Sequence, residues 1–88
     1  MKKEHSVELR VLRYFLAVCE AKNISKAAEA LHISQPSLSR QLKNLEAELG
    51  VTLFYRGHQE ITLTQEGYYL QEHAEEIISL TNKTQQNL

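Results

Sequence analysis

The strongest structural signal in this chain lies in residues 24–43, ISKAAEALHISQPSLSRQLK. This stretch predicts two short helices joined by a tight corner. Ser25 precedes a run of good helix formers, so its side chain is the expected cap of the first helix. Ser34 stands two residues before Pro36, which places the proline in the first turn of a second helix, where its missing N–H costs nothing. The residues between the helices, 31–33, leave room only for a sharp corner, as in a helix-turn-helix.

The second helix of this motif is expected over residues 35–49. Its leucines fall within an arc of about 60° on a helical wheel, and they are Leu38, Leu42, Leu45 and Leu49. Arg40 and Lys43 point the opposite way, and Ser37 and Ser39 flank this outer face. A helix in the DNA major groove needs such a basic, hydroxyl-bearing face. The wheel alone fits the solvated face of an ordinary bundle helix equally well.

Short segments on both sides extend the pattern. They are LRYF at 12–15, AA at 27–28, Leu31, SQPS at 34–37, SRQ at 39–41, LE at 45–46, LG at 49–50, LF at 53–54, Arg56 and LT-x-x-G at 63–67. These segments strongly resemble the helix-turn-helix of LysR-type transcriptional regulators, and the resemblance runs from about residue 8 to the end of the chain. The combination of SQPSLSRQ with LF-x-R and LT-x-x-G is more specific than a helix-turn-helix pattern alone.

The LysR resemblance implies a mainly α fold. A winged helix-turn-helix with a three-helix core and a two-stranded wing would occupy residues 1–64, with the helix-turn-helix at 24–43. A long linker helix would follow over residues 65–88. The implied function is sequence-specific binding of double-stranded DNA by a bacterial transcription regulator, with helix 35–49 in the major groove. Family members dimerise through antiparallel linker helices, which implies a homodimer on a pseudo-palindromic site.

The resemblance also implies contacts for individual residues. The family positions that enter the major groove match Gln35, Pro36, Ser37, Ser39 and Arg40. Ser25 and Lys26 match phosphate-contacting positions, and Arg56 matches a backbone contact from the wing. Lys43 extends the basic outer face of the second helix and completes the expected DNA-binding set. The planar guanidinium of Arg40 can bond both acceptors of a guanine edge.

Residues before and within the helix-turn-helix predict further local structure. A first helix is expected from Ser6 or Val7 to about Ala21. Asn23 is the expected left-handed residue after it. His32 occupies the corner where many helix-turn-helix proteins use glycine, and it is expected at positive φ without a ligand contact.

Residues after the second helix predict a small wing. Gly50 is expected to end the helix in a left-handed conformation. Strand composition at 51–55 and 61–63, with a turn at 56–60 between them, predicts two antiparallel strands. Thr64 is the expected cap of the last helix.

The last helix has a heptad-like seam. Its members alternate in steps of four and three, and they are Leu70, Ala74, Ile77, Thr81, Thr84 and Leu88. A domain this small cannot cover so long a seam, so pairing with a second chain is the simplest solution. The residues expected to form this contact are Leu70, Ala74, Ile77 and Thr81. The alternative is a helix that packs only on its own first helix and then frays.

Composition and charge narrow the functional class. The chain has 88 residues, enough for one small domain, and no apolar run approaches the ~20 residues of a membrane span. Residues 1–56 contain nine Lys or Arg against six Glu, a net charge of +3, whereas residues 57–88 contain one Lys against five Glu, a net charge of −4. The basic part contains the helix-turn-helix. Binding is therefore expected to depend on a few placed cations.

Other chemistry has little support. The histidines are scattered and the single cysteine, Cys19, has no partner at metal-ligand spacing, so no metal, cofactor or catalytic residue is assigned and an enzyme is not expected. Cys19 is expected to be a buried small hydrophobe, and it fits a bacterial cytoplasm, where the nucleoid DNA lies. A protein-interaction module of the same fold is the alternative. Such a helix usually exposes apolar anchors, whereas Gln35, Arg40 and Lys43 are polar.

Two features depart from the LysR pattern. Family wings often carry basic residues at the positions of Gln59 and Thr62, so wing contacts of this chain are expected to be weak. The effector-binding domain of the family is absent, and the chain is therefore expected to be a fragment or truncated product of a longer regulator. No signal peptide is expected, because the charged residues 1–5 precede no continuous apolar segment. Effector, operator and target genes are not specified by these residues.

Overall fold

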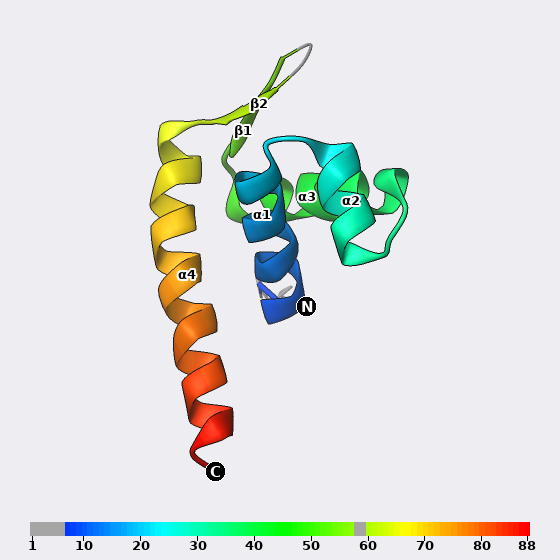
Figure 1. Ribbon diagram of the computed structural model, residues 1–88. Helices are drawn as coiled ribbons and strands as arrows, with labels where there is room; N and C mark the ends of the chain where they lie inside the picture. Colours follow the sequence, from blue (N-terminus) through cyan, green and yellow to red (C-terminus); the bar gives the residue numbers. More distant parts are fainter. Residues whose placement is uncertain (1–6, 58–59) are drawn as a thin grey trace, which may run out of the picture.

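The computed structural model describes residues 7–57 and 60–88, which form four helices and a two-stranded sheet (Figure 1). In chain order the elements are α1 (Leu9–Ala21), α2 (Ile24–Leu31), α3 (Gln35–Leu49), β1 (Phe54–Arg56), β2 (Ile61–Leu63) and α4 (Gln65–Gln86). Helix α1 packs against α2, α3 and α4. The expected mainly α fold, a winged helix-turn-helix followed by a long helix, is confirmed.

The core is built around α1. Phe15 and Val18 are fully buried, and the Phe15 ring contacts that of Phe54 with a centroid distance of 5.4 Å. Other buried residues come from α3, from the residue before β1 and from α4, and they are Leu38, Leu42, Leu45, Leu53 and Ala74. Burial of these side chains provides most of the driving force for folding. It also fixes the direction in which the opposite face of α3 points.

The helix ends confirm several predictions. The Ser34 hydroxyl accepts a hydrogen bond from the Ser37 N–H at 3.1 Å and caps α3, which spans the expected residues. Gly50 ends α3 with φ of 71°. His32 forms the corner with φ of 60°, as predicted, and its N–H donates to the carbonyl of Glu29. This left-handed residue reverses the chain between the two helices.

The link between α1 and α2 differs from the prediction. Asn23, rather than Ser25, caps α2, because its side chain accepts from the Lys26 N–H at 2.9 Å and the helix begins at Ile24. The left-handed residue is Lys22, with φ of 56°, whereas Asn23 is extended. An asparagine cannot adopt the left-handed conformation and the extended capping conformation at once, and here the cap prevails.

The structure differs from the predictions at the start of α1 and at the end of α3. Helix α1 begins at Leu9 because Glu8 is extended, so the expected start at Val7 is too early, and the expected start at Ser6 lies outside the described residues. Leu49 follows the leucine period of α3 but is 39 % exposed. It is the last residue of α3.

The wing strands are antiparallel, with Phe54 opposite Leu63 and Arg56 opposite Ile61. The first strand was expected over 51–55 but begins only at Phe54. The Val51 N–H donates to the Glu46 carbonyl and the Leu53 N–H donates to the Glu46 carboxylate, so neither group pairs with β2. Of the predicted turn at 56–60, residues 58 and 59 lie outside the described residues.

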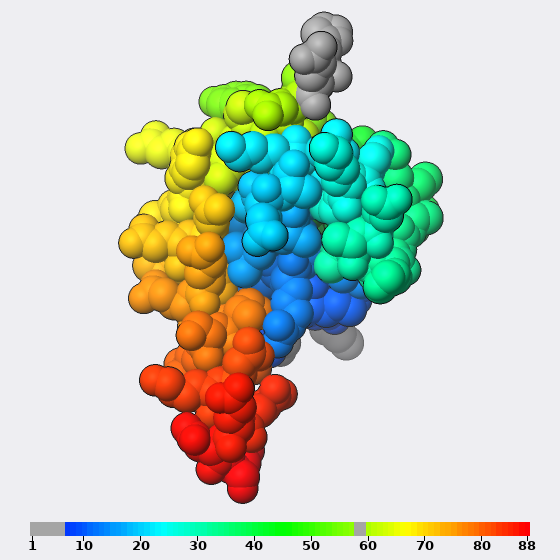
Figure 2. All heavy atoms as spheres, in the orientation of Figure 1, coloured from blue at the N-terminus to red at the C-terminus, as the bar shows by residue number. Residues whose placement is uncertain are grey.

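Helix α4 starts in close contact with the wing and then leaves the body of the domain. Thr64 caps it, as predicted, by accepting from the Gly67 N–H at 2.9 Å, and its hydroxyl donates to the Thr52 carbonyl at 2.6 Å. An added Cβ at Gly67 would overlap the carbonyl oxygen of Leu53. Glycine therefore permits the close approach. The far end of α4 projects beyond the rest of the molecule (Figure 2).

Candidate nucleic-acid interface

Two capped helix starts define the candidate interface. The caps Asn23 and Ser34 fix the first turns of α2 and α3, and the His32 corner sets the angle between the helices. Ala27 and Ala28 are buried, and their small side chains allow α2 to pack closely on its neighbours. The N-terminal turns of α2 and α3 are thereby held side by side, with their free N–H groups and partial positive charge on the same part of the surface.

A hydrogen bond connects these two helix starts. The Ser25 hydroxyl donates to the Gln35 side-chain oxygen at 2.8 Å. Both residues line an open depression of about 320 Å³, together with Ser39 of α3 and with Arg56 at the end of β1. Four of the residues predicted to bind DNA therefore share one concave surface between the helix-turn-helix and the wing.

Three of the four cations predicted to bind DNA do not line this depression. Lys26, Arg40 and Lys43 are exposed, and none of them forms an ion pair with another residue in the part of the chain that the structure describes. Their charge is available to a ligand. Pro36 is also exposed, whereas Ser37 and Ser39 are half-buried at the sides of α3. The outward face expected from the helical wheel is confirmed for Arg40 and Lys43.

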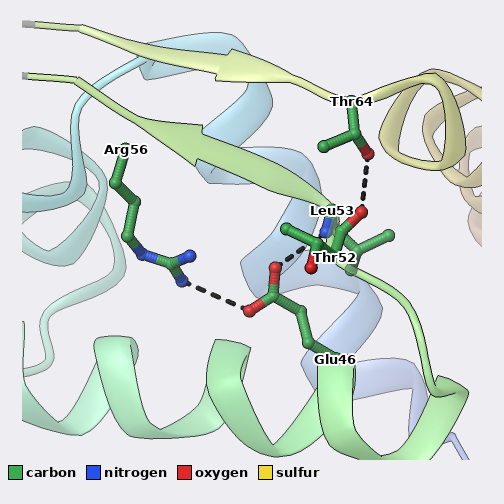
Figure 3. A network of polar contacts seen from close by, with 5 residues as sticks. All are labelled: Glu46, Thr52, Leu53, Arg56 and Thr64. Carbon is green, nitrogen blue, oxygen red and sulfur yellow. Dashed lines mark hydrogen bonds and ion pairs between the residues drawn. The ribbon is translucent and has the colours of Figure 1, made fainter.

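Arg56 is less free than the sequence suggested. One of its guanidinium nitrogens lies 3.5 Å from a Glu46 carboxylate oxygen, and the guanidinium carbon lies 5.8 Å from the centre of the Phe54 ring. The second Glu46 oxygen accepts a hydrogen bond from the Leu53 N–H at 2.7 Å (Figure 3). Glu46 thus connects α3 to the start of the wing.

No separate role was predicted for Glu46. Its carboxylate lies largely buried beneath the wing and partly offsets the charge of Arg56. A further bond, from the Ile61 N–H to the Lys22 carbonyl at 3.1 Å, ties β2 to the α1–α2 link. The wing is therefore attached to both ends of the helix-turn-helix, and its position relative to α3 is set by these bonds. An acidic residue one turn before the helix end is too common to have indicated this role.

Cys19 belongs to the core, as predicted, and not to a site. It is only 8 % exposed, and burial, with a smaller contribution from the nearby charge of Glu75, raises the pKa of its thiol to about 12. A thiol with so high a pKa holds its proton at neutral pH and is a poor nucleophile. Among residues 7–57 and 60–88, no three acidic, histidine or cysteine side chains are grouped in a way that could hold a metal ion.

Helix α4 presents a second surface of different character. Of the four residues expected to contact a partner chain, Ala74 is fully buried in its own chain and Leu70 packs against the core, so Ala74 has no surface left for a partner. Other side chains are more exposed and fall within an arc of about 80° on the helix. They form what we call the apolar stripe of α4: Tyr69, Ile77 and Leu80. No helix in the described residues is long and apolar enough to span a membrane.

This fold is a winged helix-turn-helix with an exposed basic face on α3, the second helix of the motif. Such an arrangement is typical of DNA-binding domains. Residues 9–68 match the family model for bacterial regulatory helix-turn-helix proteins of the lysR family. This chain belongs to that family, and it is a LysR-type DNA-binding domain.

Curated relatives agree with this assignment. The uncharacterised regulator YcgK of Bacillus subtilis is 50% identical over 72 residues, which cover 82% of this chain and 22% of YcgK. BenM of Acinetobacter baylyi is 48% identical over 73 residues, covering 83% of this chain and 24% of BenM. Both are named as HTH-type transcriptional regulators. This chain spans about a quarter of the length of such relatives.

Solved structures show the same fold in complexes with DNA. The DNA-binding domain of CbnR bound to DNA has a TM-score of 0.89 and 44% identity, with 92% of this chain and 93% of that chain covered. The DNA-binding domain of BenM bound to catB site 1 DNA has a TM-score of 0.86 and 45% identity, covering 89% of this chain and 87% of that chain.

Proposed function

We propose that this chain binds double-stranded DNA sequence-specifically as the N-terminal domain of a bacterial transcription regulator, with α3 in the major groove. Residues 1–64 form the DNA-binding unit, and residues 65–88 form the linker and dimerisation helix. The solved complexes of the CbnR and BenM domains with DNA support the ligand class. Because the proposed ligand is duplex DNA, we propose that the protein acts in the bacterial cytoplasm, on nucleoid DNA.

One observation carries the proposal more than any other. Arg40 is exposed on the face of α3 opposite Leu38 and Leu42, which are fully buried. The guanidinium can therefore enter a groove without any rearrangement of the core. An arginine that bonds the O6 and N7 atoms of guanine is the commonest specific contact in the major groove.

The remaining residues divide by chemistry. Gln35, Pro36, Ser37 and Ser39 lie along the N-terminal half of α3, which enters the groove. Lys26 stands at the start of α2 and Lys43 one turn beyond Arg40, where ammonium groups suit phosphate. Arg56 reaches the DNA backbone from the wing. The Glu46 carboxylate beside it partly offsets the attraction of its positive charge to phosphate. Thr62 of β2 adds no charge, and Gln59 lies outside the described residues, so the wing contributes modestly.

We propose that two copies of the chain pair through α4 and occupy a pseudo-palindromic site. Ile77 and the half-exposed Thr81 come from the predicted seam, Leu70 adds its partly buried side chain, and Tyr69 and Leu80 enlarge the surface. An exposed apolar stripe on a helix that projects beyond its own domain supports this pairing. Two half-sites then share the phosphate contacts that one weakly charged domain cannot supply alone.

The test is a salt titration on a selected operator and on random duplex, with wild type, Arg40→Ala and Lys26→Ala. We expect Arg40→Ala to cost about 1–3 kcal/mol on the operator and much less on random DNA. Lys26→Ala is expected to weaken both alike and to lower the salt slope by about one. An unchanged ratio of operator to random binding in Arg40→Ala would show that α3 is not the reading helix.

A further inference from the structure

The Ser25–Gln35 hydrogen bond joins two residues that the family resemblance treats separately, one as a phosphate contact and one as a groove contact. The donor is the Ser25 hydroxyl and the acceptor is the Gln35 amide oxygen, 2.8 Å apart. Ser25 is the second residue of α2, and Gln35 is the first residue of α3. Both side chains are exposed at the candidate interface.

Ser25 is free for this contact because it does not cap its own helix. The capping acceptor of α2 is Asn23, whose side chain bonds the Lys26 N–H. On the other side, the Ser34 cap holds the first turn of α3 through the Ser37 N–H. Both bonding partners therefore project from turns with fixed geometry, and the bond between them is set by the packing of α2 on α3.

The bond determines what Gln35 offers to a ligand. An amide group has one acceptor oxygen and one NH₂ with two donors, which point in different directions. With the oxygen held toward Ser25, the NH₂ is turned away from Ser25 as a donor. A side-chain amide that pairs with adenine in bidentate fashion turns its oxygen toward the base as well, whereas here the oxygen is turned toward Ser25. N7 is the acceptor that both purines present on the major-groove edge, and guanine adds O6 beside it.

We propose that Ser25 is a positioning residue for base recognition: it orients the Gln35 amide so that the NH₂ donates to a purine N7 in the major groove. This inference rests on the proposed function, since it needs the start of α3 to lie in the groove. Glutamine is a rotamer-rich side chain, and ordering it before binding lowers the entropy lost in the complex. Ser25 thereby adds to specificity without a base contact of its own.

A double-mutant cycle tests the coupling. Ser25→Ala, Gln35→Ala and the double variant are titrated with a selected operator and with random duplex. We expect Ser25→Ala to lower the ratio of operator to random affinity about 3- to 10-fold, the range of one modest hydrogen bond. The same change is expected to have no further effect in the Gln35→Ala background. Ser25→Thr keeps the hydroxyl and is the matched control, expected to retain the ratio.

Operator DNA with a modified base tests the contact directly. If Ser25 had only a structural role, binding by the variants would depend on the purine N7 as much as wild type does. At the purine where Gln35→Ala relaxes base preference most, N7 is replaced by C–H. We expect this replacement to weaken wild type about 3- to 10-fold and to leave Ser25→Ala and Gln35→Ala much less affected. Equal weakening of all three proteins would overturn the proposal.

Two other results would also overturn it: equal losses on operator and random DNA in Ser25→Ala, as expected of a phosphate contact, or additive effects of the two substitutions. Arg40→Ala, titrated in parallel, distinguishes failure of the Ser25 positioning role from failure of the proposed function. If Arg40→Ala lowers the operator-to-random ratio while Ser25 and Gln35 do not couple, α3 remains the reading helix and only the positioning role of Ser25 is lost. If Arg40→Ala leaves that ratio unchanged, the proposed function itself fails.

Discussion

The helix-turn-helix and helix α4 each have one buried face, but their opposite faces differ in chemistry. The outer face of α2 and α3 presents amide, hydroxyl and cationic groups, with Arg40 and Lys43 exposed. The outer face of α4 presents aromatic and aliphatic groups, among them Tyr69 at 68 % and Leu80 at 65 % exposure. Within one small domain, the first face suits a polyanion and the second suits an apolar protein surface.

The charge distribution follows the same division. Residues 1–56 carry a net charge of +3 and residues 57–88 a net charge of −4. Duplex DNA attracts the first segment and repels the second, so the weak net charge of the whole chain hides an orienting field. Overall charge is therefore a poor guide to a DNA-binding domain when an acidic helix is part of the same chain.

The junction between the two regions is expected to give the largest effect. Gly67→Ala would place a Cβ against the Leu53 carbonyl, which cannot move without breaking its bond to Thr64. We expect a loss of about 3 kcal/mol in the free energy of unfolding. Gly50→Ala is the matched control, because φ is positive there but nothing lies within 4 Å of the added atom; it is expected to cost about 1 kcal/mol. Equal losses in urea unfolding would contradict the close approach at Gly67.

The apolar stripe of α4 is tested by introducing a charge. Ile77→Asp would bury a carboxylate against an apolar partner, and we expect the dimer to dissociate about a hundredfold more readily, or ~2.7 kcal/mol. Ser79→Asp adds the same charge about 160° around the helix and is expected to leave association unchanged. Sedimentation equilibrium measures both. Wild type and Ile77→Asp of equal mass at high micromolar concentration would exclude this surface as an interface.

A smaller effect is expected at Glu46, which joins the wing to α3. Glu46→Ala leaves the Leu53 N–H without its acceptor and should lower the free energy of unfolding by about 1–2 kcal/mol. Glu46→Gln keeps an acceptor oxygen and is expected to lose less than half of that. Thermal unfolding of the two variants distinguishes the contributions. Equal losses would show that the ion pair with Arg56, rather than the bond to Leu53, is what Glu46 provides.

Local signals in the sequence predicted much of this fold. The cap at Ser34, the left-handed His32 and Gly50, and the bounds of α3 all follow from interactions within a few residues. Where two suitable residues lie close together, local signals are insufficient. Asn23 and Ser25 are both good capping residues. The helix begins at Ile24, so Asn23 occupies the capping position and Ser25 lies inside the first turn.

Contacts between different helices and strands could not be predicted from the sequence. The outward direction of Arg40 follows from the period of the leucines, but the pairing of Ser25 with Gln35 depends on the angle between two helices. The bonds of Glu46 to Leu53 and Arg56 likewise depend on where the chain passes after Gly50. Ala74 has the spacing of a dimer seam, yet the packing of α4 on α1 buries it within its own chain.

The most direct test of the division between the two faces is an NMR titration of the ¹⁵N-labelled chain with an operator duplex selected in vitro. We expect the largest amide shift changes at residues 24–26 and 35–43, smaller changes at Tyr55 and Arg56 in the wing, and none along residues 77–86 of α4. The shifts of the first group are expected to follow one saturating curve. Changes centred on residues 77–86, with residues 35–43 unaffected, would contradict the account.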